Sequence, residues 1–460
     1  MPTNDASTSE LSAPTKSEFR HILKISLPLA LGYLGELMIN VTDNIMLGHL
    51  GPEALGAAGL ALSVYFIIEM IGLGMLFPVM VLASQARGSG RSRLIPKLVR
   101  QGLWISGFLS VPGMVVLWNL KNILLMAGQD PILAELAGQY MDYYLWAVFP
   151  AFTTFAFVLA FSAMERGVTI AVVVWCQVAL NIVLNYILIF GHFGFPAMGM
   201  AGAGLASLIV HGAAHMVFFG LFAFYGFWRS MALFRRAWRP EWDTLEQLTR
   251  LGWPKTFEAV MRSCLLSVVA LLAGWLGIQE IAAHTIAYQV FFVISFSLPL
   301  AVAGAVAVRI GIASGRGDNT ALWGILNSGI VISLLFMLPP ILGLKLFSPW
   351  IVVLFTGTGP KAQALVPLAA PVIPIVSLFL IVDGLRMVTV HSLNGLADIK
   401  APAFIAAFAY WGIAFPACLV FGFMMDFGVI GLWLGLTVGV AVLVAGYLIR
   451  FREMVAKRTG

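Results

Sequence analysis

The sequence predicts an all-α polytopic membrane protein with twelve transmembrane helices in two pseudo-symmetric six-helix bundles. Composition, the spacing of apolar segments and an internal repeat lead to this prediction. Of the 460 residues, 60% are hydrophobic and only 10% are charged. An ordinary soluble domain carries about 25% charged residues. The mean hydropathy of +0.94 therefore indicates a chain that lies in a lipid bilayer.

Apolar segments follow one another along the chain with short polar connections between them. A helix needs about 20 apolar residues to cross the hydrocarbon core. Such segments lie at 22–47, 53–86, 95–120, 131–162, 168–191, 198–228, 246–275, 279–311, 319–344, 362–393, 400–424 and 427–449. They use almost the whole chain, so no sizeable soluble domain is expected.

The distribution of basic residues predicts the topology. With a cytoplasmic N-terminus, 22 of the 27 lysines and arginines lie in cytoplasmic segments and two, Arg262 and Arg386, lie within helices. The opposite face holds only Lys121, Lys345 and Lys361. Basic residues are retained on the cytoplasmic side, so both termini are expected there, in a plasma membrane or bacterial inner membrane. The net charge of +6 then needs no nucleic-acid partner.

The two halves of the chain repeat each other. Pro28 precedes the last glycine of Gly48-His-Leu-Gly51 by 23 residues, and Pro254 has the same spacing to Gly277. Both halves begin on the same side, as in transporters that rock about a central cavity. The predicted parts are a disordered cytoplasmic tail at 1–20, an N-lobe with helices 1–6 at 21–228, a cytoplasmic linker at 229–245, a C-lobe with helices 7–12 at 246–452, and a cytoplasmic tail at 453–460.

Asp43 is the first candidate for coupling to an ion. It lies late in helix 1, and no basic residue stands three or four positions away. A charged side chain at the bilayer centre costs about 2.5–3.5 kcal/mol on insertion scales, so such a residue is a functional candidate. On helix 5, Asn181 and Asn185 share one face. Their amides could complete a sodium site with Asp43, hydrogen-bond its protonated form, or only join helices. Ser207 on helix 6 is a weaker candidate.

Two pairs of opposite charges are predicted in the C-lobe. Glu258 and Arg262 are four residues apart on helix 7, and Asp383 and Arg386 are three apart on helix 10. Each pair could be a salt bridge within its helix, or the four could form one cluster that changes partners during transport. Glu36 occupies the position in the first repeat that Arg262 occupies in the second. Pseudo-symmetry would place these two residues on opposite sides of a cavity.

Four further residues are candidates for lining a substrate cavity: Glu36, Glu69, His284 and Gln289. An acid at Glu69 would attract cations, although a hydrogen bond to a neighbouring helix explains it equally well. A lone intramembrane histidine such as His284 could titrate near neutral pH, but is more often a packed hydrogen-bonding group.

Enzymatic chemistry and bound cofactors are not expected. The sequence lacks a Walker A motif, a Gly-x-Ser-x-Gly motif and a His-Glu-x-x-His motif, which argues against ATP hydrolysis and hydrolase chemistry. Cys176, Cys264 and Cys418 form no Cys-x-x-Cys pair. A metal or disulfide role is therefore not predicted for them.

Several motifs together resemble the multidrug and toxic compound extrusion (MATE) family, on its NorM-like branch. They are Thr-Asp43-Asn-Ile-Met-Leu-Gly48 in helix 1, Leu-Asn181-Ile-Val-Leu-Asn185-Tyr-Ile-Leu-Ile-Phe-Gly191 in helix 5, Ala-Ala-His284-Thr-Ile-Ala-Tyr-Gln289 in helix 8 and Val382-Asp383-Gly in helix 10. The resemblance covers nearly all of residues 20–450. It implies two six-helix bundles, alternating access, and antiport of organic cations against sodium or protons.

The resemblance also implies roles for particular residues. In such proteins a helix 1 aspartate and polar helix 5 residues form the ion or proton site, which matches Asp43, Asn181 and Asn185. Many relatives carry a carboxylate at the position of Asn185.

The C-lobe departs further from the family pattern. Asp383 matches the helix 10 acid, but Arg262 replaces the helix 7 glutamate, with Glu258 one turn earlier. Phe379 stands where a tyrosine is common. The positive charges of Arg262 and Arg386 disfavour a sodium ion there. They favour proton coupling through Asp43 over sodium, and leave room for neutral, zwitterionic or anionic substrates.

The predicted function is secondary active efflux of organic, mainly cationic drug-like compounds by antiport with protons or sodium. The expected partners are membrane lipids and small organic substrates, with the chain acting as a monomer. A lipid-linked precursor flippase of the same broad superfamily is one alternative. A membrane channel or a non-transporting scaffold is another.

Overall fold

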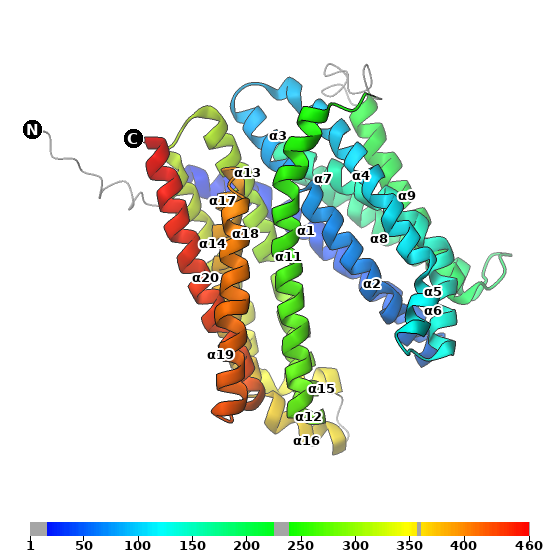
Figure 1. Ribbon diagram of the computed structural model, residues 1–460. Helices are drawn as coiled ribbons and strands as arrows, with labels where there is room; N and C mark the ends of the chain where they lie inside the picture. Colours follow the sequence, from blue (N-terminus) through cyan, green and yellow to red (C-terminus); the bar gives the residue numbers. More distant parts are fainter. Residues whose placement is uncertain (1–15, 225–238, 357–359, 460) are drawn as a thin grey trace, which may run out of the picture. The chain divides into compact units, whose positions relative to one another are not determined.

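The computed structural model describes residues 16–224, 239–356 and 360–459, and every regular element within them is helical (Figure 1). The longer helices are α1 Lys16–Gly48, α2 Pro52–Leu76, α3 Pro78–Gly88, α4 Ile95–Trp118, α5 Leu120–Met126, α6 Pro131–Tyr144, α7 Val148–Ala163, α8 Gly167–Phe190, α9 Gly199–Phe224, α11 Trp242–Leu276, α12 Ile278–Ser295, α13 Leu298–Arg316, α14 Ala321–Leu346, α15 Ser348–Thr356, α16 Pro360–Ala369, α17 Val372–Gly395, α18 Lys400–Phe408, α19 Phe415–Leu419 and α20 Gly428–Thr459.

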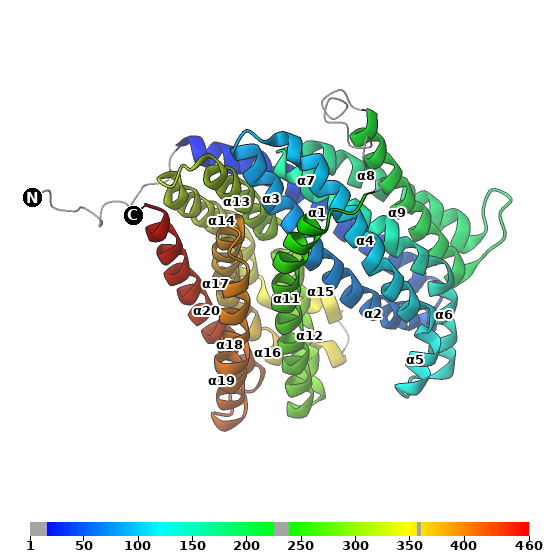
Figure 2. The ribbon, with the colours of Figure 1, turned by 45° about the horizontal axis from the view of Figure 1, so that its top comes forward.

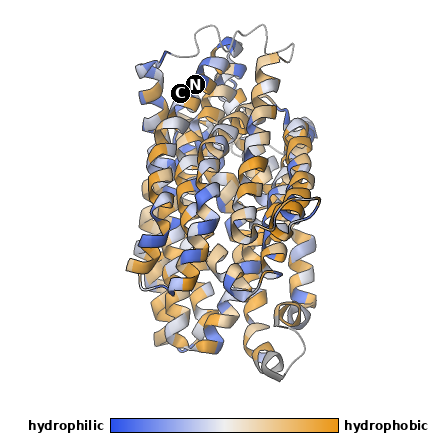
Figure 3. Cartoon of the chain, turned by 90° about the vertical axis from the view of Figure 1, so that its right-hand side faces the viewer, coloured by the Kyte–Doolittle hydropathy of each residue, from blue (hydrophilic) through white to orange (hydrophobic). Residues whose placement is uncertain are grey.

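Among the described residues, twelve helical stretches are long and apolar enough to cross a membrane, which confirms the predicted number. Figure 3 shows hydrophobic residues spread along these helices. The stretches are Lys16–Gly48, Pro52–Gly88, Ser92–Trp118, Pro131–Ala163, Gly167–Phe190, Gly199–Phe224, Trp242–Leu276, Ile278–Arg316, Ala321–Leu346, Leu365–Gly395, Lys400–Met424 and Gly428–Thr459. The chain is therefore a multi-pass membrane protein.

The chain divides into two compact units. The first unit contains residues 31–87 and 91–256, and the second contains residues 257–460 together with residues up to 30 and 88–90. The change of unit falls inside α1 and inside α11, in each case two residues after a proline, Pro28 or Pro254. Most of the predicted linker and tail, residues 229–238 and 1–15, lies outside the described residues.

Helix α9 is central to the packing of the first unit. It packs against α6, α7 and α8, while α2 packs on α6 and α4 packs on α7. Figures 1 and 2 show α4, α7, α8 and α9 running side by side. Gly204 on α9 allows close approach to α6, because an added Cβ would strike the carbonyl oxygen of Tyr140. This contact sets the polar face of α9 beside the C-terminal end of α6.

Helix α17 is the central element of the second unit. It packs against α12, α13, α14 and α20, and Figure 1 shows it among α13, α14 and α20. Its buried residues include Asp383 and Arg386, 0% and 4% exposed. Charged groups in such a position must be paired, because an isolated buried charge is strongly unfavourable.

Ion pairs fix the first turns of α1 and α11 within their own units. Arg309 of α13 makes a two-pronged contact with Glu18, from Nη2 to Oε1 at 2.6 Å and from Nε to Oε2 at 3.0 Å. Just before α11, Glu241 pairs with Lys97 and Arg100 of α4. Each helix therefore begins in one unit and continues in the other.

The eleventh membrane span differs from a regular α-helix. Between α18 and α19 the turns at Ala409–Ala414 widen to a π-helix, and the same happens at Val420–Met424. Pro416 lies between the two stretches and lacks a backbone N–H. Hydrophobic periodicity does not predict such wide turns, which often occur at functional positions.

Candidate functional site

The seam between α1 and α8 positions the first group of polar residues. Trp175 Nε1 donates a hydrogen bond to the carbonyl oxygen of Leu31 at 3.1 Å. One turn further along α1, Gly35 lets the helices touch, because an added Cβ would lie 2.6 Å from Val174 Cγ1. Two turns beyond this contact, the same faces bring Asp43 of α1 against the amides of α8.

Asp43 is held by two asparagine amides. Asn181 Nδ2 donates to Asp43 Oδ1 at 2.9 Å, and Asn185 Nδ2 donates to the same oxygen at 2.6 Å. Asn185 Nδ2 also lies 3.3 Å from Asn181 Oδ1. Both asparagines are fully buried, with 0% exposure. The structure thus brings together the three residues that the sequence predicts for the coupling site.

Two oxygen atoms at this site have no hydrogen-bond donor among the described residues. They are Asp43 Oδ2 and the fully buried Asn185 Oδ1. A buried polar atom without a partner costs about 1–3 kcal/mol. The site can therefore accept an added proton or cation, because either would satisfy these oxygens.

A cavity of about 120 Å³ opens beside Asp43, within the first unit. Its polar and charged lining includes Glu36, Asp43, Glu69, Asn181, Ser207 and His211. Glu36 precedes Asp43 by seven residues, so the two acids lie on nearly the same face of α1, about 10 Å apart along the axis. Ser207 lines the cavity as predicted, but makes no recorded hydrogen bond to Asp43.

Aromatic side chains form part of the cavity lining. The rings of Tyr65 and Tyr144 stack with their centroids 4.6 Å apart, and His211 stacks on Tyr144 at 6.0 Å. Tyr144 Oη also lies 3.5 Å from His211 Nε2. Phe66 contributes a further ring. The cavity is therefore acidic and aromatic, a combination that suits a positively charged organic group.

Four charged residues of α11 and α17 in the second unit form one network, which Ser295 of α12 joins. Arg386 Nε donates to Asp383 Oδ1 at 2.6 Å, and Arg262 Nη2 lies 3.3 Å and 3.2 Å from the two oxygens of Asp383. Arg386 Nη1 reaches Glu258 Oε1 at 3.8 Å. Ser295 Oγ donates to Asp383 Oδ2 at 3.4 Å. Of the two local pairs considered from the sequence, Asp383 and Arg386 bond within α17, while Arg262 bonds across helices to Asp383.

Arg262 is the most accessible member of this network. Its side chain is 28% exposed, against 1% for Asp383 and 5% for Arg386 and Glu258. Its guanidinium also lies over the ring of Phe291, 5.6 Å from the centroid. The two positive and two negative charges cancel, so the network carries no net charge.

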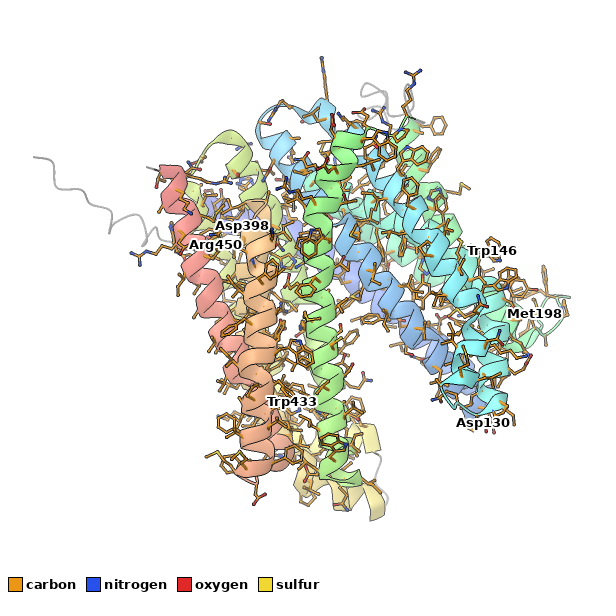
Figure 4. All side chains as sticks on the ribbon, viewed as in Figure 1. Asp130, Trp146, Met198, Asp398, Trp433 and Arg450 are labelled. Carbon is orange, nitrogen blue, oxygen red and sulfur yellow. The ribbon has the colours of Figure 1, made fainter. Side chains whose placement is uncertain are left out.

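The remaining cavity candidates lie elsewhere. His284 is buried in α12 of the second unit and packs 5.7 Å from the ring of Trp433, which Figure 4 labels on α20. Gln289 is exposed on the same helix. Neither lines the cavity beside Asp43, whereas Glu36 and Glu69 both do.

Sequence analysis missed the aromatic and histidine lining of this cavity. Helical spacing contained a usable signal, because Tyr65 and His211 stand one turn from Glu69 and Ser207, respectively. Tyr144 has no such neighbour among the predicted site residues. Its position follows from the packing of α6 against α9.

No group of three or more histidine, cysteine or acidic side chains is placed to hold a metal ion within the part of the chain that the structure describes. The pair of residues considered for sodium, Asp43 and Asn181, presents one carboxylate and an amide N–H. Oxygen atoms are the usual ligands of hard cations.

Twelve spans within the described residues, a duplicated sequence pattern and a half-buried acid facing a cavity are typical of multi-pass membrane transporters. The MatE family pattern matches residues 28–187 and 254–420. Two similar proteins, both named probable multidrug resistance protein NorM, come from Mesorhizobium japonicum and Rhizobium meliloti. The first is 34% identical over 95% of this chain and 94% of its own, and the second is 36% identical over 94% and 92%.

Solved structures share the fold. One, titled as an outward-facing multidrug resistance MATE family transporter, superposes with a TM-score of 0.87 at 20% identity, covering 100% of both chains. Another, a Pyrococcus furiosus transporter of the MOP superfamily described as having a binding pocket of reverse polarity, has a TM-score of 0.86 at 20% identity over 100% of both chains. The chain belongs to the MatE family, which confirms the resemblance found in the sequence.

Proposed function

We propose that this chain is a secondary active efflux transporter that exports organic compounds, cationic ones included, in exchange for protons. Membership of the MatE family and the multidrug resistance names of its relatives support export of drug-like molecules. One observation carries the assignment of the coupling site: a half-buried carboxylate, Asp43, faces a cavity and is paired only with neutral amides.

The proposed cycle depends on the charge of Asp43. In its ionised form the carboxylate is stabilised by the amide N–H groups of Asn181 and Asn185. Protonation removes the charge and supplies an O–H that the free Oδ1 of Asn185 can accept after a small rotation. An arriving organic cation favours the ionised form, and a proton favours the empty cavity. Competition of this kind couples the two fluxes, because each ligand shifts the same equilibrium.

Proton coupling is favoured over sodium coupling by the orientation of the two amides. A sodium ion requires several oxygen ligands, whereas both amides present N–H groups to Asp43. In the second unit Asp383 is already neutralised by Arg262 and Arg386, so a bare cation gains little there.

The proposed setting is a bacterial inner membrane, with both termini in the cytoplasm and the chain working as a monomer among lipids. The alternation of basic residues between the two sides supports this orientation.

Efflux from proteoliposomes tests the proposal. The purified protein is reconstituted, and the movement of a fluorescent organic cation is followed under a pH gradient alone and under a sodium gradient alone. Substrate movement driven by the pH gradient supports proton antiport. Movement driven only by the sodium gradient would show that the coupling ion is sodium and not the proton. Conductance without gradient-driven accumulation of the substrate would indicate a channel instead.

A further inference from the structure

The cavity in the first unit holds more negative charge than the coupling reaction uses. Three carboxylates line it, those of Glu36, Asp43 and Glu69, and no lysine or arginine is among its lining residues within the described chain. Asp43 alone receives hydrogen bonds from the α8 amides. Glu36 and Glu69 are therefore acids for which the proposed coupling step has no role.

Neither glutamate is neutralised by the protein. Among the described residues, Glu36 and Glu69 take part in no ion pair and their carboxylates accept no recorded hydrogen bond. Both are only half-buried, because they face the cavity. By contrast, both acids of the network in the second unit are paired with arginine. Ionised carboxylates without partners in an apolar surrounding are costly, so either a proton or a cation that enters the cavity compensates them.

The size of the cavity limits what can enter. Sites for whole drug-sized ligands measure about 300–1,000 Å³, whereas this cavity measures about 120 Å³. An engineered cavity of about 150 Å³ in another protein holds a benzene molecule. The space beside Glu36 and Glu69 thus fits the charged head of a substrate, such as a substituted ammonium group, and excludes its whole body.

The aromatic lining fits the same kind of group. Tyr65 and Tyr144 are stacked, and Phe66 adds a ring that is 37% exposed. Aromatic faces attract ammonium groups through the ring quadrupole, most strongly where water is scarce. The carboxylates of Glu36 and Glu69 and the aromatic rings of the lining therefore both favour a substituted ammonium group in the cavity.

We propose that Glu36 and Glu69 form a subsite for the ammonium head of the substrate, separate from Asp43, and that the transporter prefers organic dications. The inference rests on the proposed efflux function. The coupling ion neutralises the charge of Asp43, and the charges of Glu36 and Glu69 are neutralised by two positive charges on the substrate. A molecule with two ammonium groups supplies both, with one head in the cavity and the second near its mouth, whereas a monocation leaves one acid uncompensated.

Transport of two matched permanent cations tests this preference. Decamethonium carries two trimethylammonium heads on a ten-carbon chain, and decyltrimethylammonium carries one head on the same chain. Neither crosses a bilayer as a neutral amine. Uptake of each radiolabelled compound is measured in inside-out proteoliposomes under the driving gradient, for the wild type and the variants Glu36→Gln, Glu69→Gln and Glu53→Gln. Glu53 is an exposed acid at the start of α2, outside the cavity, and its variant is the matched control.

The wild type and the Glu53→Gln control are expected to prefer decamethonium by about tenfold or more, because its second cationic head adds one electrostatic attraction and tenfold corresponds to about 1.4 kcal/mol. Glu36→Gln and Glu69→Gln are expected to lose that preference while still carrying decyltrimethylammonium. Unchanged preference in both glutamine variants, or no preference in the wild type, overturns the inference.

A second readout separates this inference from the proposed function. Binding is measured in lipid nanodiscs as the rise in melting temperature that each cation causes. If the wild type moves decyltrimethylammonium under a gradient without preferring decamethonium, efflux stands and the dication subsite fails. If it moves neither compound but decamethonium stabilises it through Glu36 and Glu69, the subsite stands and the efflux function fails. If neither transport nor stabilisation occurs, both are wrong.

Discussion

The two aspartates at the centres of the two units have opposite partners. Asp43 in the first unit contacts two neutral amides and faces a cavity lined by further acids. Asp383 in the second unit contacts two guanidinium groups and the hydroxyl of Ser295. A carboxylate with neutral partners can take up and release a positive ion. A carboxylate between two arginines is already neutralised by them and therefore attracts a further positive ion only weakly.

The repeat shows where the two units diverged. Pro28 and Pro254 are 226 residues apart, and the same offset relates Glu36 to Arg262 and Glu69 to Ser295. Each cavity acid of the first unit thus corresponds to a basic or neutral residue that contacts Asp383 in the second unit. The two copies of the repeat therefore differ in charge: the first presents acids to a cavity, and the second surrounds its aspartate with two arginines.

Removing the most buried cation of the network should have the largest effect on stability. Arg386→Gln leaves Asp383 with the partly exposed Arg262 as its cationic partner and removes the contact between Arg386 and Glu258. Breaking a buried ion pair typically costs about 3–5 kcal/mol. Thermal unfolding in detergent, followed by intrinsic fluorescence, should show a clearly lower melting temperature. A melting temperature equal to that of the wild type would mean that the network contributes no stability.

Arg262→Gln should lower the stability less than Arg386→Gln does. It therefore tests which of the two arginines contributes more to the same network. Asp383 keeps its 2.6 Å contact with Arg386 and its hydrogen bond from Ser295. Because the Arg262 side chain is 28% exposed, solvent screens part of its interaction. We expect a loss of about 1 kcal/mol in the same assay, and a loss equal to that of Arg386→Gln would contradict the assigned order.

Asn185→Asp should change the ion response of the first unit. The substitution sets a second carboxylate against Asp43 and replaces an N–H donor by an oxygen, which creates ligands for a hard cation. Sodium should then raise the melting temperature of the variant relative to choline at equal ionic strength. At a sodium concentration ten times the dissociation constant, sodium binding stabilises the folded protein by about 1.4 kcal/mol. An equal sodium response in the wild type would argue for sodium coupling in the native protein.

The smallest effect is expected for an ion pair near the end of a helix. Arg450 of α20 contacts Asp398 at 2.6 Å, and Figure 4 shows the two side chains next to each other. Because Arg450 is 27% exposed, Arg450→Gln should cost no more than about 1 kcal/mol and leave transport unchanged. A large loss of efflux in this variant would show that charge outside the two central sites takes part in coupling.

Much of the fold and part of the site could be predicted from the sequence. Apolar length and repetition were enough to predict the twelve spans. The four-residue spacing of Asn181 and Asn185 was enough to predict one polar helix face. The meeting of that face with Asp43 depends on the contact between α1 and α8 at Gly35. Sequence analysis offered this meeting as one of several alternatives, and the family resemblance then implied it.

Sequence analysis named Glu36 and Glu69 among four candidates for lining a cavity, but it could not predict that Asp43 shares the cavity with them. That convergence depends on how α1 and α2 face each other. Arg262 and Asp383 are 121 residues apart in the sequence, whereas helical spacing predicts contacts only between residues of one helix. Tyr144 was missed for the same reason, since its position follows from the packing of α6 against α9. His211 was also missed, although its one-turn spacing from Ser207 could have indicated it.

Gradient-driven efflux by the variants Asp43→Asn and Asp383→Asn, measured side by side in proteoliposomes, tests the central contrast most directly. The account predicts that Asp43→Asn abolishes proton-driven efflux while its expression and melting temperature match the wild type. It predicts that Asp383→Asn melts at a lower temperature and still couples efflux to the pH gradient wherever it remains folded. Full coupling in Asp43→Asn, together with its loss in folded Asp383→Asn, would contradict the account.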